Sequence, residues 1–235
     1  MLKAVTFNIH KFYDLFNLRY TLEPLRGFLR EHNFDIVFLQ EVRGVHPKGK
    51  RSDFSKDPLE FLADQVWSDF AYGKNAIYTG GHQGNAMLSK YPLLSWSNHD
   101  ISNHSLERRS LLHGRVEVEG KELELFCTHL DLTQWGRQRQ VIKIREIISK
   151  EVKGKSSIIF GGDFNDWNGK IKNSLQKIGL LSIEPFKTYP SKLPFLELDR
   201  VFYRNIVIVD QGAVTDKKAR SLSDHIPLYC EFELR

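Results

Sequence analysis

Residues 157–166, SIIFGGDFND, carry an apolar segment directly into a group of polar side chains. The run Ser157–Phe160 predicts a short buried strand. Two glycines follow it, and Asp163 and Asn165 come directly afterwards. In sheet proteins, ligand sites gather at the ends of strands. This stretch therefore predicts a fold built on a buried sheet, with functional side chains where the strand ends.

The same arrangement occurs at five further places in the chain. A single carboxylate after a strand is more often a helix cap or a solvated loop residue. Six such sites together instead indicate one shared functional centre, because rigid strands hold reactive groups more firmly than loops do. The five are Asn8 after 5–7, Gln40-Glu41 after 36–39, Thr128-His129 after 123–127, Asp199 after 196–198, and Asp224-His225 before the last strand.

Strand and helix patterns alternate along the chain, which argues for an α/β protein with sheets packed between helices. No linker or low-complexity segment interrupts the pattern, so we expect one domain over 1–235. Helices are predicted at 18–30, from Pro58 onward, at 137–150 and at 171–178. Strands are predicted at 2–9, 35–40, 70–78, 84–89, 93–101, 110–118, 122–128, 157–160 and 226–234.

Composition places the chain among ordinary globular proteins. It has 235 residues, of which 41% are hydrophobic and 27% charged, and its apolar runs are too short for a transmembrane helix. The N-terminus lacks the features of a signal peptide, so we expect a cytoplasmic protein. We also expect a monomer. Cys127 and Cys230 lie in apolar contexts and predict buried free thiols.

The polar residue types suit the hydrolysis of a phosphate ester with a hard divalent cation. Mg²⁺, with Mn²⁺ as the alternative, prefers oxygen ligands such as Glu41 and Asp224. Asp163 can position an attacking water. The amides of Asn8 and Asn165 can orient ligands or phosphate without adding negative charge.

Two histidines complete this set of residues. His129 and His225 can donate hydrogen bonds to phosphate oxygens as negative charge develops on them. A carboxylate beside a histidine raises its basicity and fixes its tautomer, and Asp199 is the candidate partner of His225. The sequence contains no phosphate-binding P-loop, no dinucleotide-binding glycine fingerprint and no nucleophile elbow, which disfavours the chemistries that depend on them.

From Thr6-Phe7-Asn8 to Ser223-Asp224-His225, nearly the whole chain resembles the endonuclease/exonuclease/phosphatase superfamily of metal-dependent phosphoesterases. The most specific segments are Gly162-Asp163-Phe164-Asn165 and Ser223-Asp224-His225. Further support comes from Gln40-Glu41-Val42, Thr128-His129-Leu130 and the strand-like segment 84–90. The resemblance implies a four-layer α/β/β/α sandwich, in which two mixed sheets pack face to face between helices.

The resemblance also implies roles for individual residues. Glu41 would be the principal metal ligand, with Asn8 nearby, and Asp224 would be the second acidic group near the metal. Asp163 would orient or deprotonate the attacking water, with Asn165 beside it.

The remaining implied roles concern the phosphate. His225, oriented by Asp199, and His129 would contact the scissile phosphate, and Arg109 would hold phosphate. Asp131 and Asp166 lie next to the motifs, but we expect them to be caps or solvated residues.

Three functions remain open. We favour a nuclease, most simply acting on DNA, because the net charge is +5 and basic residues recur at 46–51 and at Arg137, Arg139, Lys143 and Arg145. Trp135 and Trp167 are candidates for stacking on a substrate.

The second reading is an enzyme for phospholipids or small phosphate esters, for which Phe12, Tyr13, Leu15, Phe16 and Leu18 form a candidate apolar patch. The third is a non-catalytic binding protein, which we disfavour because every aligned position carries its catalytic residue type.

Overall fold

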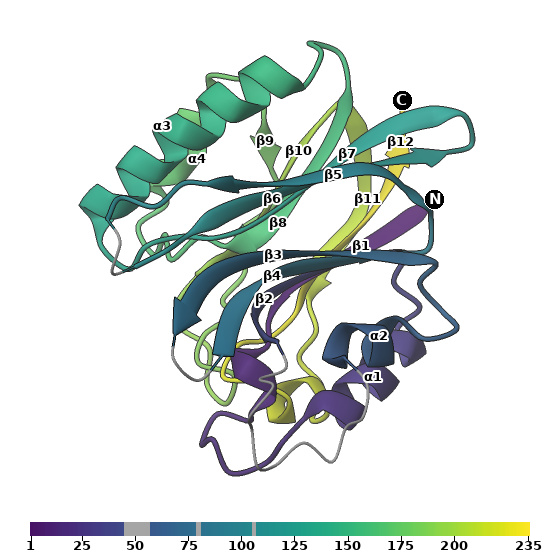
Figure 1. The fold of residues 1–235 in the computed structure, drawn as a ribbon, viewed down its shortest axis with the longest axis vertical. Helices are drawn as coiled ribbons and strands as arrows, with labels where there is room; N and C mark the ends of the chain where they lie inside the picture. The colour runs from purple at the N-terminus through teal and green to yellow at the C-terminus, as the bar shows by residue number, and fades with distance from the viewer. Residues whose placement is uncertain (45–56, 79–80, 105–106) are drawn as a thin grey trace.

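Two six-stranded β-sheets lie face to face, and helices cover the outer face of each (Figure 1). The computed structural model describes residues 1–44, 57–78, 81–104 and 107–235. Its four layers confirm the predicted α/β/β/α sandwich. No helix in the described part of the chain is long and apolar enough to cross a membrane.

The first sheet has the strand order β11-β12-β1-β2-β4-β3. Its parallel pair is β1 and β2, and its other neighbours are antiparallel, so the sheet is mixed. The strands are β1 (Leu2–Asn8), β2 (Ile36–Arg43), β3 (Asp69–Tyr78), β4 (Gly81–Ser89), β11 (Ile206–Ala213) and β12 (Leu228–Leu234).

The second sheet has the order β5-β6-β7-β8-β10-β9 and is also mixed, with β7 and β8 parallel. Its strands are β5 (Leu93–Asp100), β6 (Ser110–Val118), β7 (Lys121–His129), β8 (Ser157–Asp163), β9 (Leu181–Ser182) and β10 (Asp199–Arg204). The seven residues of β8 are all buried, as the apolar run in its sequence predicts.

The helices cover the sheets in pairs. α1 (Leu22–Glu31) and α2 (Pro58–Ala63) lie on the first sheet, and α3 (Gln134–Glu151) and α4 (Lys170–Gln176) lie on the second (Figure 1). Two short 3₁₀ turns, η1 (His10–Phe12) and η2 (Ala219–Ser221), follow β1 and precede β12. Three apolar clusters therefore form, one beneath each helix pair and one between the sheets.

Close approach of the two sheets depends on Gly161 in β8. A Cβ atom there would lie 2.7 Å from Cδ2 of Phe38 and 3.0 Å from Cβ of Thr6, both in the first sheet. Such contacts are far below van der Waals distance, so a larger residue would force the sheets apart. The first glycine of the Gly161-Gly162 pair thus lets the end of β8 lie against the ends of β1 and β2.

The structure corrects several element predictions. The first helix begins at Leu22 rather than at residue 18. The sequence reading missed β9, β10 and β11, and residues 196–198 form no strand; Asp199 instead begins β10. The prediction that Cys127 and Cys230 are buried free thiols is confirmed.

Candidate active site

Strand register places Asp163 at the centre of a row of functional residues. On the second sheet Asp163 pairs with His129 of β7 on one side and with Asp199 of β10 on the other. Residues that pair across neighbouring strands point to the same face of a sheet. On the first sheet, Asn8 pairs with Gln40 at the ends of β1 and β2.

Asp163 is also one of the points where polar contacts link the two sheets. Its side chain is buried, and its Oδ2 accepts a hydrogen bond from Nδ2 of Asn8 at 3.0 Å. The same oxygen lies 3.5 Å from Nε2 of His129 and 3.7 Å from Nε2 of His225. One carboxylate oxygen therefore faces an amide and two imidazoles.

His225 forms a second, tighter carboxylate contact. Its Nδ1 lies 2.7 Å from Oδ2 of Asp199, which is the partner predicted from the sequence. Burial acts to lower the pKa of His225, but the carboxylates of Asp199 and Asp163 outweigh it and raise the pKa to about 10. The imidazole is therefore held as a cation at neutral pH.

His129 has the opposite charge state. Burial, reinforced by the nearby positive charge of Arg109, lowers the pKa of His129 to about 3 despite the proximity of Asp163. Its ring is therefore neutral at neutral pH. Asp163 lies between one neutral histidine and one cationic histidine.

The backbone at Glu41 departs from the regular geometry of β2. The pairing of β2 with β4 shifts between Leu39 and Val42, and Glu41 adopts a positive φ of 57°. A bulge of this kind re-aims a side chain, and a non-glycine residue in the left-handed region signals strain at a functional position.

The side chain of Glu41 has an unsatisfied acceptor. Among the described residues, its buried Oε2 has no hydrogen-bond partner, and Nζ of Lys11 lies 3.5 Å away. A buried carboxylate oxygen without a donor is costly, and a hard cation would relieve that cost. Glu41 is therefore suited to hold a divalent ion.

The other two predicted metal ligands lie close to this part of the site. The Oδ1 atom of Asn8 accepts a hydrogen bond from the amide of His10. The hydroxyl of Ser223 donates its one proton to the carbonyl of Asn8 at 2.7 Å, and the same Oγ lies 3.1 Å from Oδ1 of Asp224. Ser223 thus ties the segment that carries Asp224 to the end of β1.

Asn165 and Arg109 already have partners inside the protein. The amide nitrogen of the Asn165 side chain donates to the carbonyl of Leu130 at 2.9 Å, and its backbone N–H donates to Asp163. Arg109 pairs with Glu107 at 2.5 Å. Arg109 also lines, with Glu41 and His129, a pocket of about 150 Å³.

A single family model matches residues 5–225, nearly the whole chain, and it describes the endonuclease/exonuclease/phosphatase family. The chain belongs to this family. Family members are hydrolases that act on phosphate esters.

Two relatives known by sequence show how far the likeness extends. The uncharacterized protein YbhP of Escherichia coli is 39% identical over 244 residues, which cover 99% of this chain and 96% of the relative. Tyrosyl-DNA phosphodiesterase 2 of Bos taurus is 26% identical over 173 residues, which cover 68% of this chain and 41% of that protein.

Solved structures of the family share the fold at low sequence identity. An endonuclease/exonuclease/phosphatase protein from Beutenbergia cavernae superposes with a TM-score of 0.78 at 19% identity, over 99% of this chain and 71% of that one. The mannosyl-6-phosphatase Bt3783 of Bacteroides thetaiotaomicron gives 0.78 at 17% identity, over the full length of both chains.

Two residues near the family motifs were missed by the sequence reading. Lys11 lies beside Glu41, and Nδ1 of His10 lies 3.9 Å from Oδ1 of Asp224. Both belong to η1, directly after Asn8. Their position next to the first motif was the available signal, but their orientation depends on positive φ angles that the sequence does not reveal.

Asp131 and Asp166 accept hydrogen bonds near the starts of α3 and α4, but the N-cap residues of these helices are Thr133 and Gly169. Asp166 accepts hydrogen bonds from the amides of Lys170 and Ile171 at the start of α4. Asp131 accepts from the amide and hydroxyl of Thr133, just before α3. Both are buried rather than solvated.

Proposed function

We propose that this protein is a Mg²⁺-dependent phosphodiesterase that cleaves nucleic acid, with DNA as the favoured substrate. The observation that carries the proposal is the environment of Asp163. Its Oδ2 faces the neutral His129 at 3.5 Å and the cationic His225 at 3.7 Å. A carboxylate in this position can take a proton from an attacking water while the histidines contact the phosphate.

The charge states divide the remaining work between the two histidines. His225 is held cationic by Asp199, which contacts its Nδ1. Its other ring nitrogen can donate a hydrogen bond to a phosphate oxygen as negative charge develops there. His129, held neutral, can donate a hydrogen bond without adding a second positive charge next to Arg109. The Asn8 amide holds Oδ2 of Asp163 in place.

Glu41 would hold the divalent ion, with Asn8 and Asp224 nearby. Among the described residues, no group of three carboxylate, histidine or cysteine ligand atoms within 4.8 Å of one another includes Glu41. Oxygen ligands such as Glu41 and Asp224 suit Mg²⁺, which typically binds one or two carboxylates and keeps several waters. When bound, the ion supplies Lewis-acid stabilisation of the phosphate.

Exposed aromatic side chains near the motifs favour a nucleic acid over a compact substrate. Trp135, at the start of α3, and Trp167, two residues after Asn165, are 60% and 61% exposed. The guanidinium of Arg139 lies 4.6 Å above the ring of Trp135. Exposed aromatic rings beside arginine suit stacking with the bases of a single strand.

The names of two relatives point in the same direction. Tyrosyl-DNA phosphodiesterase 2 of Bos taurus is a sequence relative, and a Danio rerio homologue of that enzyme, solved with a single-stranded DNA product, shares the fold with a TM-score of 0.71 at 20% identity. These names favour DNA as the substrate. The exposed tryptophans described above give a structural reason for the same choice.

Part of the predicted basic surface is not available for phosphate. Arg137 is buried and donates to the carbonyls of Asp131 and Leu132, and Lys143 donates to those of Ile101 and Ser102. Arg137 is thereby withdrawn from the surface and Lys143 is held at the carbonyls of 101–102, while the role predicted for them in neutralising a backbone stays a prediction. The basic segment 46–51 lies outside the described residues.

A small phosphate ester is the second candidate substrate. The pocket that Glu41, Arg109 and His129 line measures only about 150 Å³, and the fold neighbour Bt3783 is a mannosyl-6-phosphatase. The lipid reading has less support. Phe12 of its predicted patch is buried, although Phe16 and Leu18 are 63% and 80% exposed.

The test is a substrate panel with purified protein and Mg²⁺. Plasmid DNA, single-stranded DNA, RNA, mannose 6-phosphate, phospholipid vesicles and a chromogenic phosphodiester would be compared. We expect cleavage of DNA, lost with EDTA and in Asp163→Asn. Asp210→Asn, on the edge strand β11, is the matched control and should retain full activity.

The outcomes separate the alternatives. Turnover of mannose 6-phosphate alone would replace the nuclease by a phosphomonoesterase and keep the catalytic residues. Cleavage of DNA that persists in Asp163→Asn would overturn the proposed role of that carboxylate.

A further inference from the structure

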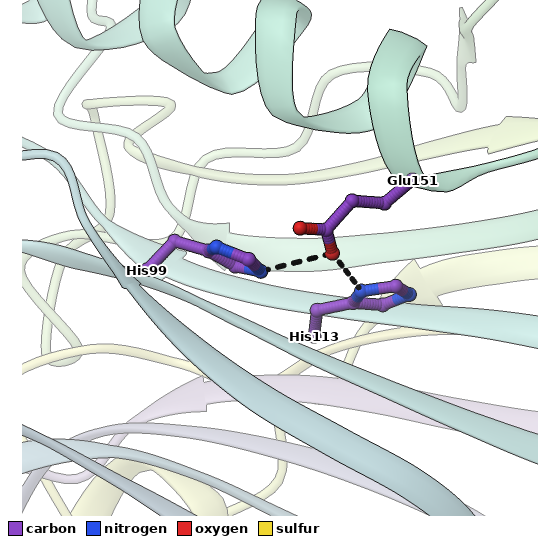
Figure 2. A group of neighbouring side chains, drawn as sticks. All are labelled: His99, His113 and Glu151. Atoms are coloured by element: carbon purple, nitrogen blue, oxygen red, sulfur yellow. Dashed lines mark hydrogen bonds and ion pairs between the residues drawn. The ribbon is translucent and has the colours of Figure 1, made fainter.

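A second histidine–carboxylate cluster lies at the far end of α3 from the candidate active site. His99 of β5 and His113 of β6 point toward Glu151, the last residue of α3 (Figure 2). Nε2 of His99 lies 3.1 Å, and Nδ1 of His113 lies 3.2 Å, from the same oxygen, Oε2 of Glu151. All three ligand atoms lie within 4.8 Å of one another.

The sheet register brings the two histidines together on one face. His99 pairs with Leu111, two residues from His113, so the two imidazoles are diagonal neighbours on adjacent strands. The His113 ring also stacks on Phe126 of β7 at a centroid distance of 4.3 Å. Packing therefore restricts the His113 ring before any ligand binds.

The buried carboxylate of Glu124 determines the tautomer of His113. The ring nitrogen that faces Glu151 is then a hydrogen-bond acceptor. Nε2 of His113 lies 2.7 Å from Oε2 of Glu124, and Glu124 is 1% exposed. The other oxygen of Glu124 accepts from Arg115 at 3.0 Å. In metal sites, a ligating histidine commonly donates its second N–H to a carboxylate in this way, which leaves the first nitrogen free to coordinate.

This tautomer creates an electrostatic conflict that a cation resolves. When Nε2 of His113 donates to Glu124, its Nδ1 presents a lone pair to Oε2 of Glu151, and both atoms are acceptors. Only a cation between them, either a proton or a metal ion, makes the contact attractive. Nε2 of His99 lies beside the same oxygen and supplies a second imidazole nitrogen for coordinating the ion.

The spacing suits a small transition-metal ion. Zn²⁺ binds imidazole nitrogen and carboxylate oxygen at about 2.0–2.2 Å, which places two ligands of a tetrahedron roughly 3.3–3.5 Å apart. The nitrogen–oxygen distances of 3.1 and 3.2 Å are close to that distance between two ligands. Glu151, whose side chain is 32% exposed, leaves the cluster open to solvent for entry of the ion and for a fourth ligand.

The cluster is separate from the candidate active site. Thr133 caps the start of α3 two residues after Asp131, at the active-site end, whereas Glu151 ends the helix 18 residues later. A helix of that length spans about 27 Å. An ion at Glu151 is therefore too distant to share ligands with Glu41 or Asp163.

We propose that His99, His113 and Glu151 form a binding site for a Zn²⁺-like transition-metal ion, with Glu124 orienting His113. The three ligands come from two strands and one helix, so the site ties the edge of the second sheet to the end of α3. The sequence gives no sign of it because no short ligand spacing is involved.

The test is Zn²⁺ binding to the full chain after EDTA treatment and its removal, measured by competition with a chromogenic chelator. A saturating Mg²⁺ concentration and a Glu41→Gln/Asp163→Asn background remove ligands from the active site, where Asp163, Asp199 and His225 also bring their ligand atoms within 4.8 Å of one another. We expect one tight Zn²⁺ equivalent, and we expect affinity at this site to fall at least tenfold in Glu151→Gln and in His99→Ala. Glu146→Gln, an exposed position on the same helix, is the matched control and should bind as the parent does.

A second readout guards against loss of folding. Zn²⁺ should raise the melting temperature of the parent and of Glu146→Gln but not that of Glu151→Gln, and Co²⁺ should give visible absorption bands only where the site is intact. Equal Zn²⁺ stoichiometry and affinity in the parent, Glu151→Gln and His99→Ala would overturn the proposal. Absence of a tight equivalent in the parent would do so too.

Discussion

Two histidines in this molecule are each placed between two carboxylates. His225 lies between Asp199 and Asp163, at 2.7 and 3.7 Å. His113 lies between Glu124 and Glu151, at 2.7 and 3.2 Å. The pairs of contacts are alike, but the surroundings differ.

The difference is solvent access on one side of the ring. His225, Asp199 and Asp163 are all buried. Burial lowers the pKa of His225, but the carboxylates of Asp199 and Asp163, with that of Asp224, outweigh it and raise the pKa to about 10. Around His113, Glu151 is partly exposed and a second histidine faces the same oxygen. The enclosed arrangement holds His225 as a cation, whereas the open arrangement around His113 gives the proposed metal ion a path from solvent.

The largest expected effect comes from removing the carboxylate that faces the two catalytic histidines. In Asp163→Asn the side chain keeps its shape but cannot accept a proton from water. We expect turnover to fall roughly 10²- to 10⁴-fold, the usual contribution of a general base. Rates on the best substrate of the panel measure this, and a loss below tenfold would rule out Asp163 as the base.

The matching change at the other cluster should affect stability instead of turnover. Glu124→Gln removes a buried charge shared by His113 and Arg115, and we expect a loss of about 3 kcal/mol in the free energy of unfolding. Urea unfolding measures it, with the exposed Glu117→Gln of the same sheet as control. If turnover falls by more than a few-fold in folded protein, the two clusters are not independent.

Asp199→Asn tests what keeps His225 charged. Burial alone lowers the pKa of His225, so removing the main opposing charge should bring the pKa down from about 10. The cation would then be lost at lower pH, and the alkaline limb of the pH–rate profile should move to lower pH. We expect turnover at neutral pH to fall about 10- to 100-fold, as for other carboxylates that orient a functional histidine. An unchanged alkaline limb would contradict this role.

The pH dependence of stability gives the most gradual effect, because it is spread over several pH units. His129 has a folded pKa of about 3, below that of an unfolded histidine, so the unfolded chain gains protons first and stability falls as pH drops from about 6.5 toward 3. His225 has a raised pKa, so its contribution is present below about 6.5 and is lost as pH rises toward 10. We therefore expect these two groups to place a maximum of stability near pH 6.5.

Each histidine contributes a slope of at most about 1.4 kcal/mol per pH unit to its side of that maximum. Urea unfolding from pH 4 to 9 measures it, and His129→Gln should flatten only the acid side. An acid-side slope unchanged in that variant would show that other groups control it.

Much of the active-site arrangement was predictable because it follows strand ends. Asn8, Glu41, His129 and Asp163 come directly after apolar runs, and the sheet register brings those runs together. The pairing of Asp199 with His225 was expected from their chemistry. The roles of these residues in catalysis remain predictions until activity is measured.

The parts that could not be predicted depend on long-range packing. β10 and β11 adjoin without a turn signature, so the sequence reading did not detect them as strands. Arg137 and Lys143 looked like surface cations because helix periodicity does not reveal which carbonyls lie within reach. The cluster at Glu151 combines three elements with no common motif.

Gly161 makes the spacing between the sheets a property of catalysis as well as of the core. Asp163, the proposed catalytic carboxylate, lies two residues after this glycine on β8, and the Asn8 amide that donates to it comes from β1 in the other sheet. Any change in the volume of Phe38 or Thr6, which lie against Gly161, would alter the distance across which Asn8 reaches Asp163. Under the proposed function, packing between the sheets would therefore set the Asn8–Asp163 contact, and substitutions at Phe38 or Thr6 would change turnover as well as stability.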